Sequence, residues 1–155
     1  MDENVEYIVR RLTPLECSRL QGYPDFWLML PEKTDMSDAE FEEWQEIRRT
    51  ITEMQGKTYK PCKTKESMLK WYNKMIAADS NKYKALGNSI CLPQWYWLFW
   101  KMKPYLGEHP TLGSLFDGIG GFPCVFEELY GEGSAVWASE VEPYPIAVTK
   151  VRLPE

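Results

Sequence analysis

The residues from Phe116 to Gly121 place an acidic side chain and three glycines at the end of an apolar run, and Glu140 follows twenty-two residues after Gly118. Gly118 and Gly120 permit positive backbone angles and let a ligand approach the main chain. Free amides at the start of a following helix favour a carboxylate or another anionic group. An acid that ends the next strand typically accepts hydrogen bonds from ribose hydroxyls. The spacing predicts a nucleoside-cofactor site, although a tight turn without a ligand has the same sequence.

Three classes of ligand use such a turn. A dinucleotide site needs a third glycine three residues after Gly120, where this chain has Pro123, so NAD is disfavoured. A P-loop needs a lysine followed by serine or threonine, and no such loop occurs. S-adenosylmethionine (SAM) remains as the expected cofactor.

The elements around this turn predict an α/β unit. Apolar patterning and turn residues indicate a β-α-β-α order, which is the start of a parallel, Rossmann-like sheet. The predicted strands are Leu112–Phe116 and Ala135–Glu140, and the predicted helices are Gly121–Tyr130 and Pro143–Val151. We therefore expect residues 111–155 to begin a cofactor-binding domain.

The preceding part, residues 1–104, is predicted to be mainly helical, with a charged insert at 31–82. Capping-box patterns at Thr13 and Ser37 indicate two helix starts. The predicted elements are helices over Leu12–Leu20, Ser37–Met54, Thr64–Ala78 and Pro93–Met102, and a turn over Lys84–Ile90. The last helix contains the aromatic row Trp95–Trp100. Because large aromatic side chains drive burial, we expect this helix to be packed on both sides rather than to stack nucleobases.

Composition is that of a globular protein, with 44% apolar and 26% charged residues among 155. No segment resembles a signal peptide or a membrane span, which predicts a cytoplasmic protein without membrane contact. The chain has four cysteines, no CxxC pair and a single histidine, His109. This pattern predicts reduced thiols and no metal site.

The net charge of −5 is unevenly distributed. Residues 32–46 carry one basic and seven acidic side chains, whereas residues 47–84 carry ten basic and three acidic ones. A basic stretch attracts phosphate backbones, so residues 47–84 are a candidate DNA contact. A solvated helix face balanced by the neighbouring acidic run is the alternative.

Four segments together resemble one enzyme family. "LGSLFDGIGGF" and "VWASEVEPYPIAV" resemble motifs I and II of DNA (cytosine-5) methyltransferases. "RRLTPLECSRLQGYPDFW" at Arg10–Trp27 resembles motif IX, and "YKALGNSICLP" at Tyr83–Pro93 resembles motif X. In the usual layout motif I comes first and motifs IX and X close the chain. The present order, IX and X before I and II, resembles a circular permutation or a partial enzyme.

The resemblance implies positions for the SAM site. Motif I residues would surround the methionine end and the adenine of SAM. Glu140 would hold the ribose hydroxyls, with Val141 or Glu142 beside the adenine. The motif X turn would close over the SAM carboxylate. The implied cofactor-binding residues are Phe116, Gly118, Ile119, Gly120, Phe122, Glu140, Val141, Asn88 and Ser89. In motif IX, Thr13 and Glu16 are interpreted as a helix cap.

The family's catalytic motifs are absent. The resemblance implies a nucleophilic cysteine in Pro-Cys-Gln, a glutamate in Glu-Asn-Val and an arginine in Gln-x-Arg (motifs IV, VI and VIII), and none occurs here. Pro61–Cys62 is followed by lysine, and Cys124 lies in the first turn after the glycine loop, so neither cysteine is expected to be the nucleophile. No catalytic residue is therefore predicted in this chain.

Two functional hypotheses remain open. Two parallel strands with free edges make a poor isolated sheet, so a second chain or another copy should complete it. The first hypothesis is a part or small subunit of a SAM-dependent DNA (cytosine-5) methyltransferase, of a phage or restriction-modification type, that meets DNA through the completed enzyme. The alternative is a non-catalytic binding protein: a SAM sensor, or a phage-type inhibitor whose acidic insert mimics DNA phosphates.

Overall fold

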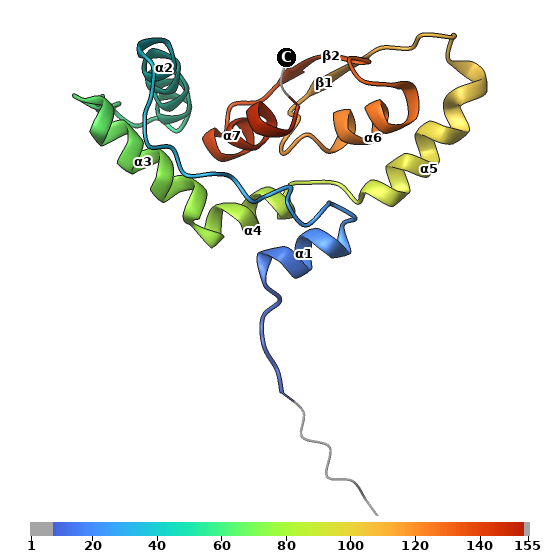
Figure 1. The fold of residues 1–155 in the computed structure, drawn as a ribbon, viewed down its shortest axis with the longest axis horizontal. Coiled ribbons are helices and arrows are strands. Elements are labelled where there is room, and N and C mark those ends of the chain that lie inside the picture. The colour runs from blue at the N-terminus through green and yellow to red at the C-terminus, as the bar shows by residue number, and fades with distance from the viewer. Residues whose placement is uncertain (1–7, 154–155) are drawn as a thin grey trace, which may run out of the picture.

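The structure, a computed structural model, describes residues 8–153 of the chain. The first part of the chain is helical. From β1 onward strands and helices alternate, and the two strands form a small parallel sheet (Figure 1). The elements are α1 (Pro14–Leu20), α2 (Asp38–Met54), α3 (Lys65–Ala77), α4 (Asp79–Gly87), α5 (Leu92–Met102), the 3-10 helix η1 (Lys103–Tyr105), β1 (Leu112–Leu115), α6 (Gly121–Tyr130), β2 (Ala135–Ser139) and α7 (Pro143–Arg152). The fold is mixed α and β, as expected.

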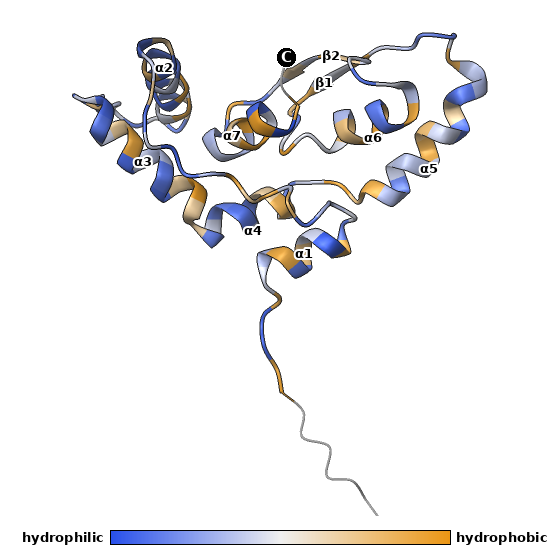
Figure 2. Cartoon of the chain, viewed as in Figure 1, coloured by the Kyte–Doolittle hydropathy of each residue, from blue (hydrophilic) through white to orange (hydrophobic). Residues whose placement is uncertain are grey.

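Capping residues begin the first three helices where the sequence predicts them. Thr13 and Glu16 form the reciprocal pair at α1, Ser37 and Glu40 form it at α2, and Thr64 caps α3. Each cap satisfies amides that have no partner within the helix. Hydrophilic and hydrophobic residues alternate along α3 (Figure 2), and its buried side is formed by Met68, Tyr72, Met75 and Ile76.

The turn predicted over Lys84–Ile90 is wrong in its first half. Residues Lys84–Gly87 form the last turn of α4, and the chain leaves the helix only at Asn88. The sequence signal was weak because only Ala85 and Leu86 are buried in α4, so no apolar stripe marks it. Tertiary packing of this helix against α1 and α7 compensates for the missing pattern.

The two strands pair in parallel, with Ser114 opposite Ala138 and Leu115 opposite Ser139. An irregularity after Leu112 leaves Val136 as an extra residue in β2. Helices α6 and α7 lie on the same side of the strands, and in Figure 1 no described helix lies on the other side. Leu115 and Trp137 are accordingly 65% and 51% exposed. We call these two side chains the open sheet face.

One hydrophobic core joins the helical half to the sheet half. It contains Tyr23 and Trp27 after α1, Trp44 of α2, Tyr72 of α3 and Phe126 of α6. Arg152 at the end of α7 donates to backbone carbonyls of Trp27 and Met29, which also ties the two halves together. Residues far apart in sequence are therefore fixed relative to the loop after β1.

The expectation that the aromatic helix is packed on both sides is wrong. In α5, Trp95 and Phe99 both pack on Phe122 of α6 with T-shaped rings. The opposite side of α5 is open: Tyr96, Trp97, Leu98 and Trp100 are 37–58% exposed. Among the other described helices and strands, only α6 and the short η1 contact α5, so these exposed side chains have no partner element there. Across residues 8–153, none of the helices has the length and apolarity that crossing a bilayer requires.

Candidate cofactor-binding site

The loop between β1 and α6 is held by the carboxylate that ends β2. Glu140 accepts hydrogen bonds from the amide of Gly118 at 2.7 Å, and from the amides of Val141 and Glu142 at 2.6 and 2.8 Å. The amide of Asp117 donates to the carbonyl of Ser139, which continues the sheet pairing by one step. The predicted ribose-binding acid therefore also fixes the shape of the predicted cofactor loop.

Positive backbone angles concentrate in this loop. Gly118 and Gly120 have φ of 62° and 79°, and Phe116 has φ of 54°, the only positive φ of a non-glycine residue within 8–153. A side chain on Gly120 would approach Leu153 at 2.6 Å, whereas a side chain on Gly118 would meet open space. Phe116 is 85% exposed despite its strained backbone. Such strain together with an uncovered aromatic ring is typical of functional sites.

Asp117 is a further candidate site residue, which the sequence did not single out. Its side chain is 6% exposed, one carboxylate oxygen accepts a hydrogen bond from the Ser114 hydroxyl, and the other, Oδ2, has no partner. Burial raises the pKa of the Asp117 carboxyl above its ordinary value, against the lowering effect of the Ser114 hydrogen bond. The sequence signal for this residue was an acidic side chain within the glycine turn. An unpaired buried carboxylate is costly, and a cationic ligand group would satisfy it.

The motif X turn lies beside the glycine loop, as the resemblance implies. A side chain on Gly121 would come within 2.8 Å of Ile90 and 2.5 Å of the Tyr23 hydroxyl, so only glycine fits there. Ser89 shares a short hydrogen bond with Tyr23, and Asn88 ends α4 with an exposed side chain. The structure thus brings Ser89 and Ile90 close to the start of α6, and Asn88 directly precedes them.

Two of the implied cofactor residues point into the core. Ile119 is fully buried, and its carbonyl accepts a hydrogen bond from the Trp27 indole at 2.8 Å. The Phe122 ring packs against Trp95 with ring centroids 4.6 Å apart. Ile119 and Phe122 therefore support the loop from the side of the core. Their contact with a cofactor stays a prediction.

An open cleft of about 470 Å³ lies next to the start of α7. Glu142 borders it and forms an ion pair with Lys84 of α4 at 2.8 Å. Its lining residues from the other helices are Ile51, Gln55, Trp71, Lys74, Met75, Ala78 and Asn81. Because Val141 and Glu142 follow Glu140 directly, the cleft adjoins the side of the loop where the resemblance implies adenine.

Cys124 and Cys62 lie in positions typical of structural cysteines, whereas Cys91 is exposed. Burial raises the pKa of the Cys124 thiol to about 11, which disfavours the thiolate that nucleophilic attack requires. Cys62 lies between α2 and α3, where Arg48 donates to its sulfur at 2.7 Å. All four cysteines are unpaired. Among residues 8–153, His, Cys, Asp and Glu side chains form no group of three that could hold a metal ion.

A comparison with curated proteins gives one informative relative. The chain is 34% identical over 95 residues to a protein of Escherichia phage P1 described as a DNA N-6-adenine-methyltransferase. The match covers 61% of this chain. The chain is a partial homologue of a phage DNA methyltransferase. It spans about a ninth, 11%, of that relative's length.

This match supports a methyltransferase-related role and, in general terms, the use of SAM. The relative's description specifies adenine N6, whereas the motif resemblance implies cytosine C5. No family model matches the chain, and no solved structure is similar to it. The comparison therefore does not determine which base is methylated.

Proposed function

We propose that this chain is one part of a SAM-dependent DNA methyltransferase and contributes the first half of its cofactor pocket. The observation that carries the proposal is the loop after β1, which closes on Glu140 and leaves one buried oxygen of Asp117 without a partner. SAM supplies an activated methyl group, and its amino-acid end carries an ammonium and a carboxylate. Asp117 would accept hydrogen bonds from the ammonium, while the start of α6 and the Asn88–Ser89 turn face the carboxylate.

The chain is proposed to bind SAM without catalysing transfer alone. The sequence has none of the motifs that the resemblance requires for attack on cytosine, and the Cys124 thiol is buried and protonated at neutral pH. The open sheet face and the free edges of β1 and β2 fit a second polypeptide, or further chain, that adds strands to this sheet. That partner would carry the nucleophile and the surface that reads DNA.

We propose cytosine C5 as the methylated position, because four segments resemble the cytosine-5 family and hydrogen bonds join all four in the structure. The name of the phage P1 relative does not decide this point, since the match covers about a ninth of that protein. Nucleoside mass spectrometry on DNA treated with the completed enzyme separates the two outcomes. 5-Methylcytosine would support the assignment, and N6-methyladenine alone would overturn it.

The inhibitor hypothesis is weakened by the ion pairs that the acidic segment, residues 32–46, forms within the chain. Four of its seven carboxylates form ion pairs within the chain: Asp38 with Lys65, Glu40 with Lys33, Glu43 with Lys150 and Glu46 with Arg49. A mimic of DNA phosphates needs its negative charges free to meet a partner's lysines and arginines. The acidic segment is therefore better explained as a surface whose ion pairs connect α2 with α3 and α7.

Calorimetric titration of the 155-residue chain with SAM and S-adenosylhomocysteine tests the proposal. We expect micromolar binding that Asp117→Asn weakens, because an amide carries no charge to match the ammonium. Glu132→Gln, an exposed charge change away from the loop, serves as the matched control. Absence of binding by a folded wild-type chain would reject a preformed cofactor half and favour a purely structural or interaction role.

A further inference from the structure

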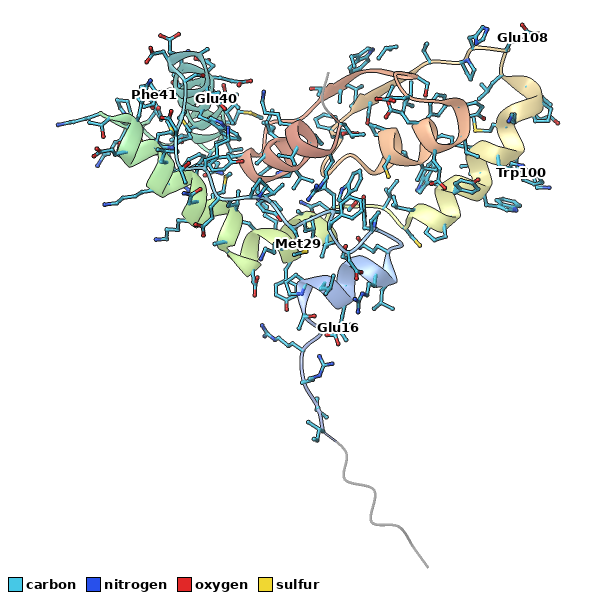
Figure 3. All side chains as sticks on the ribbon, in the orientation of Figure 1. Glu16, Met29, Glu40, Phe41, Trp100 and Glu108 are labelled. Atoms are coloured by element: carbon cyan, nitrogen blue, oxygen red, sulfur yellow. The ribbon has the colours of Figure 1, made fainter. Side chains whose placement is uncertain are left out.

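Helix α5 presents two tryptophans and a lysine on its uncovered side. Trp97 and Trp100 are 58% and 51% exposed. The Lys101 ammonium lies over both indoles, 5.7 Å from the Trp97 ring centroid and 4.9 Å from that of Trp100. We call Trp97, Trp100 and Lys101 the aromatic stripe. Figure 3 shows the Trp100 side chain directed away from α6, on the outside of the molecule.

The core does not account for these side chains. The packing of α5 on α6 uses the opposite side of the helix, through Leu92, Trp95 and Phe99. Helix spacing puts positions 97, 100 and 101 together, since residues three and four apart are neighbours on a helix surface. The stripe is thus a continuous exposed surface rather than the edge of the core.

The charge around the stripe favours an anionic partner. Residues 92–105 contain Lys101 and Lys103 and no acidic side chain. Neither lysine forms an ion pair with any carboxylate of the described residues. Two carboxylates lie near the helix without belonging to the stripe: Glu128 borders the same shallow cleft as Tyr96, and Glu108 follows η1. A protein interface of this kind would ordinarily be depleted in lysine.

We propose that the aromatic stripe binds single-stranded nucleic acid by stacking unpaired bases on Trp97 and Trp100, with Lys101 and Lys103 placed beside the backbone phosphates. Proteins bind single strands by this combination of aromatic faces and positive charge. Duplex DNA has no free base faces, so it binds the stripe more weakly. The inference does not depend on SAM binding, because the stripe lies on α5 and shares no residue with the loop after β1.

Fluorescence anisotropy with labelled oligothymidylate tests this. A length of about twelve nucleotides lies within the known range of ~4–16 nucleotides per binding module. Removal of both rings in Trp97→Ala/Trp100→Ala should weaken binding at least about twenty-fivefold, since each stacked base contributes roughly fivefold or more. Lys101→Glu should weaken it as well, and neutralisation of about two phosphates predicts a log–log salt slope of about −1.4. Trp137→Ala, which removes a similarly exposed indole from the open sheet face, should leave binding unchanged.

Three outcomes would overturn the proposal. Equal binding of the duplex form, unaffected by loss of the two indoles, would assign the affinity to another surface. In a second outcome, Lys60→Glu/Lys63→Glu loses binding while Trp97→Ala/Trp100→Ala still binds. This result would assign the binding to the basic loop between α2 and α3, at the other end of the molecule (Figure 1). No binding, together with self-association that the double tryptophan variant abolishes in sedimentation, would assign the stripe to contact between copies. Circular dichroism of each variant verifies folding, and SAM titration of the same samples reports separately on the cofactor site.

Discussion

The Gly118 amide and the Glu140 carboxylate form a 2.7 Å hydrogen bond between residues twenty-two positions apart. Through this bond the end of β2 determines the shape of the loop after β1. The same carboxylate accepts from the amides of Val141 and Glu142, so three backbone donors converge on one side chain. Each carboxylate oxygen has two lone pairs, so three accepted bonds leave one, on the oxygen that accepts from Gly118, for a ribose hydroxyl.

Glu140→Ala should weaken SAM binding by about 1.5–3 kcal/mol, the range for hydrogen bonds to a charged group. The physical reason is twofold, since the variant loses the ribose acceptor and releases the Gly118 amide. Isothermal titration calorimetry measures the change. Glu140→Gln keeps one acceptor oxygen and should recover part of the affinity. An unchanged dissociation constant in the alanine variant would remove Glu140 from the cofactor site.

Asp117→Asn should weaken cofactor binding without lowering the stability of the ligand-free protein. Burial raises the folded-state pKa of Asp117, so its favourable contribution is complete below the unfolded pKa of about 4 and is lost as pH rises through the folded pKa. Above that window the wild type holds a buried carboxylate with an unpartnered oxygen, and the variant does not. We expect equal or higher thermal stability of the ligand-free variant at pH 7, with weaker SAM binding. Melting curves from pH 4 to 8 test the first part; a variant that is less stable at pH 7 would show that the carboxylate has a partner.

The Cys124 thiol should be nearly inert to alkylation. With a pKa of about 11, only on the order of one thiol in a thousand is ionised at pH 8. Iodoacetamide labelling followed by peptide mass spectrometry should modify the exposed Cys91 first and Cys124 on the order of a hundred times more slowly. The labelling rate of Cys124 should rise about tenfold per pH unit as long as the fold persists. Rapid labelling at pH 7 would contradict the structural role assigned to this residue.

Trp27→Phe should destabilise the protein and loosen the cofactor loop. The Trp27 indole donates to the Ile119 carbonyl in a buried hydrogen bond across 92 residues. Phenylalanine leaves that carbonyl unpaired, which costs about 1–3 kcal/mol before any loss of packing. Urea unfolding gives the change in the free energy of unfolding. Trp97→Phe, at an exposed position, is the matched control and should change it by less than about 0.5 kcal/mol.

Local chemistry in the sequence was sufficient to predict most helix starts. The Thr13, Ser37 and Thr64 caps act within four residues, so their effect is visible without tertiary information. The glycine loop and the β-α-β-α order were predicted for the same reason, because backbone angles and element lengths are local properties, whereas the cofactor role of Glu140 stays a prediction. Helix α4 was missed, since its stability comes from packing on α1 and α7 rather than from its own pattern.

The sequence by itself determined which residue types could form the site, and the tertiary structure decided which of them meet. Ile119 and Phe122 occupy motif positions, but core packing directs their side chains away from the loop surface. Asp117 became a candidate only when its burial and its unpartnered oxygen were visible. The exposure of Trp97 and Trp100 likewise depends on which elements cover α5. Burial is set by distant segments that close over a residue, and hydrophobicity in the sequence does not reveal whether those segments are present.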